Sequence, residues 1–195
     1  MRSDFRDAAV ERVRDPLGSR RPHHCIELRQ QLAVFNVYAV NGADSPYRAP
    51  ATGAVVGMRH DRRLASHRLL LEECRRSDAR GWRVVLAGDF NVAGGVLDGW
   101  PKLRAFPEKH VRNRAHFNVR FFEDEDGLKA VDVCRALKGR ERRYTYFPQG
   151  RPWGSSCDHV DFVVVSKMLL DQGRVVESGI LDSMEERGPS GHVPL

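Results

Sequence analysis

The residues best suited to chemistry stand where an apolar stretch of the chain stops. Val84–Leu86 is a short apolar run of the kind found in buried strands, and Gly88–Asn91 follows it almost directly. Asp89 and Asn91 are two positions apart, so their side chains can project on the same side at the end of a strand. A carboxylate can accept a proton from water or hold a cation, and an amide can donate a hydrogen bond to a phosphate oxygen. The same four residues are also typical of a turn that ends a strand, so the pattern alone leaves both interpretations open.

A second carboxylate lies within a stretch that predicts a strand. Asp161 falls inside His159–Val165, and burying a carboxylate there is unfavourable unless a partner compensates its charge. His192, in the segment Pro189–Leu195, is a candidate partner, because an aspartate holds an imidazole in one tautomer and favours its charged form. Taken singly, Asp161 could instead cap backbone groups, and His192 could be an ordinary histidine of the tail.

A tyrosine ends another predicted strand. Leu32–Tyr38 alternates apolar and other residues, which predicts a strand, and Asn41 with Gly42 follows as a turn signal. The hydroxyl of Tyr38 could donate to a phosphate, although a single tyrosine there is more often a half-buried core residue. Hydrolysis of a phosphodiester needs a cation, a base and donors that hold the transition state, and these three places together could supply them.

The elements that must carry these residues alternate between strands and helices. After the strand Leu32–Tyr38 and a loop to about His60, apolar residues at helical spacing predict a helix over Arg62–Ala79, with His67 packed on its inner face. A buried strand over Arg83–Ala87 follows. The remaining predictions are a helix at Glu108–Phe122, an element of unclear type at Gly127–Leu137, and strands at Arg143–Phe147, His159–Val165 and Val175–Ile180. This order indicates a mixed α/β sandwich.

Composition narrows the class of protein and its partners. The chain has 195 residues with 41% hydrophobic and 30% charged side chains, which fits a globular domain rather than a disordered chain. No apolar run approaches the ~20 residues of a membrane span, and the first residues lack the apolar core of a secretory signal, so we expect a nuclear or cytoplasmic protein with no membrane partner. The net charge of +6 favours a polyanionic partner such as nucleic acid, although a merely basic protein would show it too. Four widely spaced cysteines argue against a zinc cluster.

The chain divides into a short lead-in and one domain. Residues 1–24 are rich in Arg and Asp and contain Pro16, Gly18 and Pro22, so we expect a poorly ordered lead-in there and a domain over residues 25–195. His23 and His24 stand beside a cysteine, but nothing nearby completes a metal site, and exposed polar residues are the favoured interpretation.

Taken together and in order, these strings resemble the exonuclease III branch of the endonuclease/exonuclease/phosphatase superfamily. That family carries Asn-Val-Tyr-x-x-Asn, Gly-Asp-x-Asn, a Thr-aromatic strand, an Arg-x-Asp-Tyr strand and Ser-Asp-His-x-Pro. The matching segments here are Asn36–Asn41, Gly88–Asn91, Tyr144–Phe147, Val160–Phe162 and Ser190–Pro194. The resemblance covers about residues 26–195, and its ordered matches are far more specific together than any one alone.

The resemblance implies a four-layer α/β sandwich and hydrolysis of phosphodiesters with Mg²⁺ or Mn²⁺, the nearest branch of the family acting in repair of abasic DNA. Tyr38 would bind the phosphate, and Asp89 would orient or deprotonate the attacking water and, with Asn91, hold the metal. Asp161 would pair with His192, which would contact a phosphate oxygen. Further substrate contacts implied by the matching strings come from Asn41, Asn91 and Tyr146.

The sequence also departs from the family pattern. Gly191 stands where the family has the aspartate of Ser-Asp-His, so one metal ligand is absent, and Asp158 with His159 replace the aromatic-Arg pair, which puts the abasic-sugar pocket in doubt. The first half of the family domain, with its principal glutamate ligand, and the last strand have no counterpart here. We therefore expect a partial four-layer sandwich of marginal stability, truncated and weakened or inactive, for which the missing N-terminal half is a candidate partner.

Three functions stay open at this stage, so the assignment as an enzyme is itself open. The leading one is a Mg²⁺-dependent hydrolase that cleaves DNA, as an abasic-site endonuclease or a 3′-exonuclease. The second is a nucleic-acid-binding module without catalysis, whose affinity would fall steeply with salt. The third is a phosphatase of the same superfamily that acts on a small phosphoester.

Overall fold

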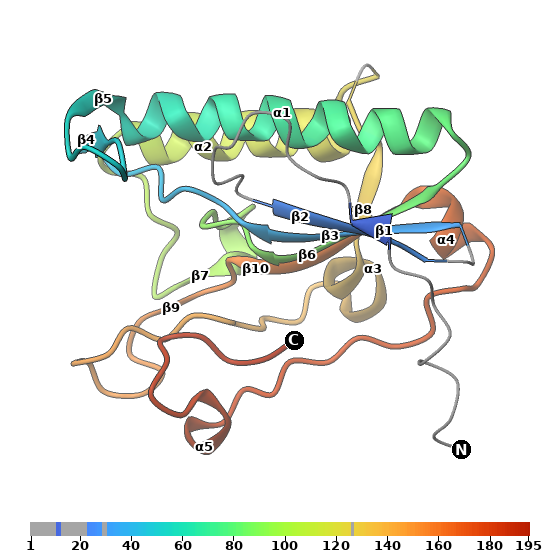
Figure 1. Cartoon of the computed structure of the whole chain (residues 1–195). Coiled ribbons are helices and arrows are strands. Elements are labelled where there is room, and N and C mark those ends of the chain that lie inside the picture. Colours follow the sequence, from blue (N-terminus) through green and yellow to red (C-terminus); the bar gives the residue numbers. More distant parts are fainter. Residues whose placement is uncertain (1–10, 13–22, 29–30, 126) are drawn as a thin grey trace.

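A six-stranded sheet forms the centre of the computed structural model (Figure 1), which describes residues 11–12, 23–28, 31–125 and 127–195. Its strand order is β1-β2-β3-β6-β10-β8, with β3 and β6 parallel and the other pairs antiparallel. The strands are β1 Glu11–Arg12, β2 His23–Leu28, β3 Leu32–Tyr38, β6 Arg83–Asp89, β8 Ala130–Asp132 and β10 Asp161–Ser166.

Helices cover one face of this sheet, and most of the chain that follows β8, apart from strand β10, lies on the other (Figure 1). The covering layer consists of α1 (Arg59–Ala79) and α2 (Lys109–Asn118), which continues as a π-helical turn over Val119–Glu123. The other helices are short: η1 Val96–Asp98, α3 Val133–Lys138, α4 Lys167–Asp171 and α5 Met184–Arg187. Two small two-stranded sheets are also present, the hairpin of β4 (Pro46–Arg48) with β5 (Val55–Met58) and the pair of β7 (Gly99–Trp100) with β9 (Cys157–Asp158). The predicted mixed α/β class is confirmed, and the described chain holds one large sheet of the sandwich with its helical layer.

The core lies between the sheet and α1 with α2. On β3 the buried positions alternate, with Ala33, Phe35 and Val37 facing the helices as the sequence predicts. An aromatic cluster closes the same core near the end of β6: Phe90 meets Phe162 with ring centroids 5.8 Å apart and nearly perpendicular planes. This packing fixes the backbone on either side of Asp89.

The predicted helix positions pack as expected. His67 is buried and stacks on His116, with ring centroids 5.4 Å apart, between α1 and α2. Burial, together with the nearby charge of Arg63, lowers the pKa of His67 well below its usual value, so its imidazole is neutral. It is therefore a packed core residue of α1, as its position on the inner face predicts.

Strand register brings the candidate residues to one edge of the sheet. In the parallel pair β3–β6, Tyr38 is the partner of Asp89, and in the antiparallel pair β6–β10, Asp161 stands opposite Asp89. Directly opposite residues project on the same face of a sheet. Three residues that are far apart in sequence are thus adjacent because of the pairing of the three central strands.

Several predicted elements are different in the structure. Residues 143–147 and 175–180 are not strands; Tyr146 makes only isolated bridges to Asp158 and His192, and Ile180 is held by burial of its side chain. The loop expected up to about His60 contains the β4–β5 hairpin, and Gly127–Leu137 divides into β8 and the start of α3. Apolar or aromatic side chains give both segments a strand-like pattern. Residues 143–147 are held by scattered backbone hydrogen bonds to Asp158, Gly191 and Val193 and not by a continuous ladder, whereas Ile180 is held by burial of its side chain.

The start of the domain also differs in detail. β2 begins at His23, which is buried and whose Nε2 lies 2.6 Å from Glu73 Oε2, so the expectation that His23 is exposed is wrong. The predicted lead-in falls mainly on residues 1–10 and 13–22, which lie outside the described residues. No helix within the described ranges combines the length and apolarity that crossing a membrane requires.

Gly88→Ala tests whether close strand contact at the site requires glycine. Gly88 has φ +132°, and a Cβ there would lie 2.1 Å from the carbonyl oxygen of Val37 on β3. We expect a loss of about 2–4 kcal/mol in the free energy of unfolding, because the two strands must separate locally.

Gly173→Ala is the matched control, since Gly173 has φ +63° but open space around its Cβ position. It should cost only the about 1–2 kcal/mol of a left-handed alanine. Urea unfolding of both variants gives the comparison, and equal losses would show that the approach of β3 to β6 is not what requires Gly88.

Candidate active site

Asp89 and Asn91 form a closed hydrogen-bonded unit at the end of β6. The backbone N–H of Asn91 donates to Asp89 Oδ1 at 2.6 Å, and Asn91 Nδ2 donates to Asp89 Oδ2 at 2.8 Å and to the Ala39 carbonyl at 2.8 Å. Asn91 has φ +51°, a left-handed conformation that asparagine tolerates better than most residues. Both amide hydrogens of Asn91 are thus engaged, which leaves its Oδ1 as an acceptor suited to a cation rather than as a donor to phosphate.

Asp161 and His192 form the pair that the sequence predicts. His192 Nδ1 lies 2.9 Å from Asp161 Oδ2. This hydrogen bond raises the pKa of His192, and the negative charges of Asp161 and Asp89 raise it too, whereas burial lowers it. The raised pKa favours the imidazolium. Because Nδ1 is engaged by Asp161, Nε2 is the nitrogen left to contact a ligand.

The two carboxylates at the centre of the site repel each other. Burial, with a smaller contribution from the charge of Asp161, raises the pKa of Asp89 to about 6, against the lowering effects of the Asn91 N–H, His192 and Arg63. Asp89 therefore changes charge near neutral pH, as a group that takes a proton from water during a reaction must do. Perturbed pKa values of this kind in a pocket are typical of functional sites.

Thr145 connects the strand that carries Asp161 to the segment that carries His192. Its buried Oγ1 accepts hydrogen bonds from the backbone N–H groups of Val160 and Asp161, both at 3.0 Å, and its carbonyl accepts one from Val193 N–H at 2.9 Å. The sequence marks Thr145 only as part of a motif. The structure shows that it is a positioning residue for the Asp161–His192 pair.

A pocket of about 310 Å³ opens beside these groups. Every site residue that the sequence predicts lines this pocket except Asp161, which is hydrogen-bonded to His192. Tyr38 is 74% exposed and hence not a core residue. The residues of the predicted site that line it are Tyr38, Asn41, Asp89, Asn91, Tyr146 and His192.

Cationic side chains that the sequence analysis did not assign to the site also line the pocket. Arg63 of α1 is buried and donates to the carbonyls of Phe90 and, at 2.8 Å, of Asn91, so it clamps the turn after β6. It lies four residues before His67 on the same inner face of α1, and an arginine on a buried helix face is a signal that could have found it. The other basic side chains that line the pocket are Arg104, His110 and Arg114.

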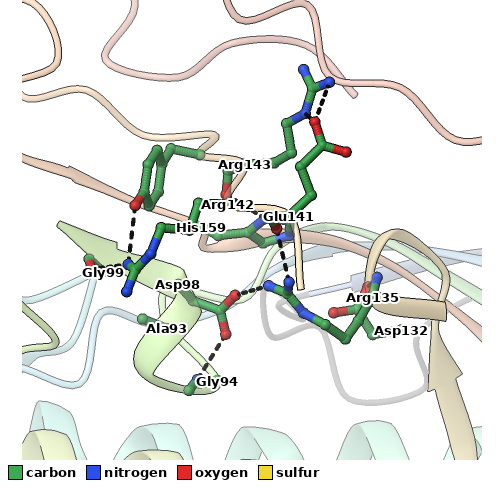
Figure 2. Close-up of polar contacts among 12 residues, drawn as sticks. Ala93, Gly94, Asp98, Gly99, Asp132, Arg135, Glu141, Arg142, Arg143 and His159 are labelled. Carbon is green, nitrogen blue, oxygen red and sulfur yellow. Dashed lines mark hydrogen bonds and ion pairs between the residues drawn. The ribbon is translucent and has the colours of Figure 1, made fainter. Parts of the chain in front are cut away.

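An ion-paired network supports the pocket from the side of α3 (Figure 2). Arg135 Nη2 lies 2.6 Å from Asp98 Oδ1, and Asp98 Oδ2 accepts the N–H of Gly95 at 2.7 Å. The carbonyl of Asp98 accepts the N–H of His159 at 2.8 Å. These bonds fix the segments around residues 93–98 and 158–160, both of which contribute residues to the pocket.

Gly191 lies next to the ring of Tyr146, so a side chain at position 191 would contact that ring. A Cβ on residue 191 would lie 2.8 Å from Tyr146 Cε2, so the tyrosine ring occupies the space into which that side chain would project. The same ring lies against the imidazole of His192, with centroids 4.9 Å apart. Where the resembling family has a carboxylate, this chain has an aromatic ring in contact with the catalytic histidine candidate.

The donor set fits a hard divalent cation. Among the described residues, Asp89, Asp161 and His192 are the group whose ligand atoms lie within 4.8 Å of one another, and Asn91 adds a neighbouring oxygen. Oxygen donors suit Mg²⁺ and Mn²⁺, and a cation would offset the burial and the charge of Asp161 that together raise the pKa of Asp89. Asp89, one of the two predicted ligands, belongs to this group, and Asn91 stays a predicted ligand beside it; Nδ1 of His192 is already engaged by Asp161.

Fold and site together combine a mixed α/β sheet with two carboxylates and an Asp–His pair at the ends of its central strands, which are groups suited to hydrolysis of a phosphoester. Residues 10–183 match the Endonuclease/Exonuclease/phosphatase family, so the chain belongs to that family. A search of curated protein sequences finds no match.

Solved structures share the fold at low sequence identity. A 3′ phosphatase, NExo, from Neisseria, bound to a product DNA hairpin, has a TM-score of 0.65 and 21% identity over 96% of this chain and 68% of its own. The APE2 catalytic domain of Xenopus laevis has a TM-score of 0.57 and 22% identity over 83% of this chain and 47% of its own. An AP endonuclease from Archaeoglobus fulgidus has a TM-score of 0.58 and 18% identity over 95% of this chain and 69% of its own. The chain therefore spans about half to two thirds of these structures.

Asp161→Asn tests the pairing directly. We expect the pKa of His192 to fall, because the substitution removes the charge of the group that contributes most to raising it. NMR titration of the histidine resonances measures the change. Asp182→Asn, an exposed aspartate paired with Arg143, is the control and should leave His192 unchanged. A His192 pKa that is the same in all three proteins would contradict the pair.

Proposed function

We propose that this chain acts as a divalent-metal-dependent hydrolase on phosphodiester bonds in DNA, of the abasic-site endonuclease or 3′-exonuclease type. The observation that carries the proposal is the convergence of Tyr38, Asp89, Asn91 and the Asp161–His192 pair on one pocket. These are the groups that phosphoester hydrolysis needs: a base, a cation site and donors to phosphate oxygens.

Each residue has a role that follows from its surroundings. Asp89, with a pKa of about 6, accepts a proton from the attacking water at neutral pH. His192, kept charged by Asp161, donates from Nε2 to a phosphate oxygen, and the exposed hydroxyl of Tyr38 donates to another. Mg²⁺ or Mn²⁺ held by Asp89 and Asn91 Oδ1 would supply charge neutralisation at the phosphate when bound.

The charge around the pocket supports an extended polyanionic substrate. Arg63, Arg104 and Arg114 bring three guanidinium groups to the pocket, and His110 lies among them with a pKa lowered by burial and by these same cations. The chain has a net charge of +6. A phosphate chain fits this surface better than an uncharged substrate does. DNA is further favoured because the solved structures that share the fold are described as a DNA-bound 3′ phosphatase and an AP endonuclease.

Weak catalysis is part of the proposal. Gly191 offers no carboxylate, and the Tyr146 ring lies where such a group would project, so the ion is held by fewer protein oxygens. The same observation favours a second candidate function, binding of nucleic acid without hydrolysis. The two functions differ in whether the DNA is cleaved when Mg²⁺ or Mn²⁺ is present, and in whether that cleavage depends on Asp89.

Asp89→Asn provides the main test. We expect Mg²⁺- or Mn²⁺-dependent cleavage of abasic and 3′-recessed duplex DNA by the unmodified chain, and a loss of roughly 10²–10⁴-fold in the variant, because Asn accepts no proton from water. The rate of the unmodified chain should rise as the pH increases through about 6, where Asp89 ionises, and fall again as His192 loses its proton above its raised pKa.

Asp171→Asn is the control for that experiment, since Asp171 pairs with Lys167 on the surface of α4. DNA binding with no metal-dependent cleavage at any pH would overturn the hydrolase and support the binding module. If a small phosphoester were cleaved in preference to DNA, the proposed substrate would be wrong and the proposed hydrolysis of a phosphoester would stand.

Restoring the family aspartate should require a second change. Gly191→Asp alone would force a Cβ to within 2.8 Å of the Tyr146 ring, so we expect lower stability and no gain in metal affinity. Gly191→Asp combined with Tyr146→Ala frees the space, and Mn²⁺ affinity measured by calorimetry should rise by roughly tenfold or more over Tyr146→Ala alone. If Gly191→Asp alone binds Mn²⁺ tightly without loss of stability, the obstruction by Tyr146 is wrong.

A further inference from the structure

The loop between β7 and α2, residues 100–107, carries an aromatic side chain that the rest of the fold does not use. Phe106 is 87% exposed, the most exposed aromatic residue in the described part of the chain. An aromatic side chain of that size normally contributes to a core or an interface. Here the aromatic cluster of the core is formed entirely by others, among them Phe90, Phe117, Phe121 and Phe162.

The loop lies at the pocket. Arg104, two residues before Phe106, lines the pocket, and so does His110, whose backbone N–H donates to the Pro107 carbonyl at 3.0 Å. Since consecutive Cα atoms are about 3.8 Å apart, Phe106 lies within about 8 Å along the chain of a residue that lines the pocket. The backbone at Phe106 thus lies between two residues, Arg104 and His110, whose side chains line the pocket, while its own ring faces solvent.

Both ends of the loop are fixed to the body of the protein. At one end, Arg142 donates to the Gly99 carbonyl at 3.2 Å (Figure 2), and its guanidinium lies 6.0 Å from the centre of the Trp100 ring. At the other end, Arg114 of α2 donates to the carbonyls of Arg104, at 2.6 Å, and Ala93, at 2.9 Å. Phe106 is thus presented from a loop that is held in place, so little order has to be gained on binding.

The residues around Phe106 are mainly basic. Lys102 and Arg104 precede it on the loop, and Arg112 is exposed on the following helix. Acidic groups lie in the same region: Asp158 lies 3.9 Å from Arg104, and Glu108 directly precedes α2. An aromatic ring among lysine and arginine is the arrangement by which proteins bind unpaired nucleotides, with the base on the ring and the phosphates on the cations. A protein partner would need a larger continuous apolar surface than this single ring.

We propose that the loop 100–107 binds an unpaired nucleotide next to the phosphate in the pocket, with the base stacked on Phe106 and the flanking phosphates on Lys102 and Arg104. The inference rests on the proposed function for the position of that phosphate. It assigns the substrate class more narrowly, as nucleic acid with a single-stranded end or gap at the site. Fully paired duplex would leave Phe106 without a base to contact.

Two DNA ligands with the same phosphates separate stacking from charge. One is a duplex with a four-nucleotide single-stranded overhang, and the other has abasic spacers in place of the four overhang nucleotides. Fluorescence anisotropy in EDTA measures binding of the full chain to each. We expect Phe106→Ala to weaken binding of the overhang with bases by roughly 5- to 150-fold and to leave the spacer overhang unchanged. Phe106→Trp should retain the affinity, because its ring also stacks.

Val176→Ala is the matched control, since Val176 is also 87% exposed but lies outside the pocket lining. It should bind both ligands like the unmodified chain. Lys102→Ala should weaken both ligands alike and reduce the dependence of log affinity on log salt by about one unit. Equal affinity of Phe106→Ala and the unmodified chain for the overhang with bases would overturn the inference, as would equal loss on both ligands.

The outcome is independent of hydrolysis, because binding is measured without metal. Suppose that Phe106→Ala weakens binding of only the overhang with bases, while Asp89→Asn leaves cleavage in the presence of metal unchanged. The proposed hydrolase then fails, and the loop remains a nucleotide-binding site. If Asp89→Asn abolishes cleavage and Phe106→Ala binds normally, the hydrolase stands and the loop inference fails.

Discussion

The site depends on two carboxylates that strand register sets opposite each other. Asp89 on β6 and Asp161 on β10 are partners in an antiparallel pair, and both are buried. Burial disfavours the charge of Asp89 and the nearby charge of Asp161 adds to this effect, so the pKa of Asp89 is raised. The arrangement is stable only with compensating groups, so the positions of His192, Asn91 and Arg63 follow from this one constraint.

The compensating groups come from three separate parts of the chain. Arg63 comes from α1. Burial lowers the pKa of its guanidinium, and the negative charge of Asp89 offsets part of that effect. His192 comes from the C-terminal segment, and Thr145 holds that segment against β10. Because each group reaches the carboxylates from a different element, the packing of α1 and the C-terminal segment on the sheet is directly coupled to the charge state of the site.

The sequence predicts the carboxylates and their histidine well, because their signals are local. Asp89 follows an apolar strand and Asp161 interrupts one, and both patterns are visible in fewer than ten residues. Thr145 and Arg63 could not be assigned roles in this way, since each acts through backbone groups of segments 15 to 28 residues away or more. The segment around Tyr146 was expected to be a strand because β-rich residues resemble one. In the structure it is a connector with isolated bridges to two neighbours.

Carboxylates and guanidinium groups lie side by side at the pocket, and their opposite charges affect how a phosphate binds. Asp89 and Asp161 repel a phosphate, whereas Arg63, Arg104 and Arg114 attract one. A phosphate beside the carboxylates is favourable only when a cation or the charged His192 lies between them, so ion and phosphate should assist each other's binding. The replacement of a carboxylate by Gly191 beside Tyr146 removes negative charge from the pocket. Under the proposed function this change would weaken the hold on the ion and lower the repulsion of the phosphate, and so would favour binding over catalysis.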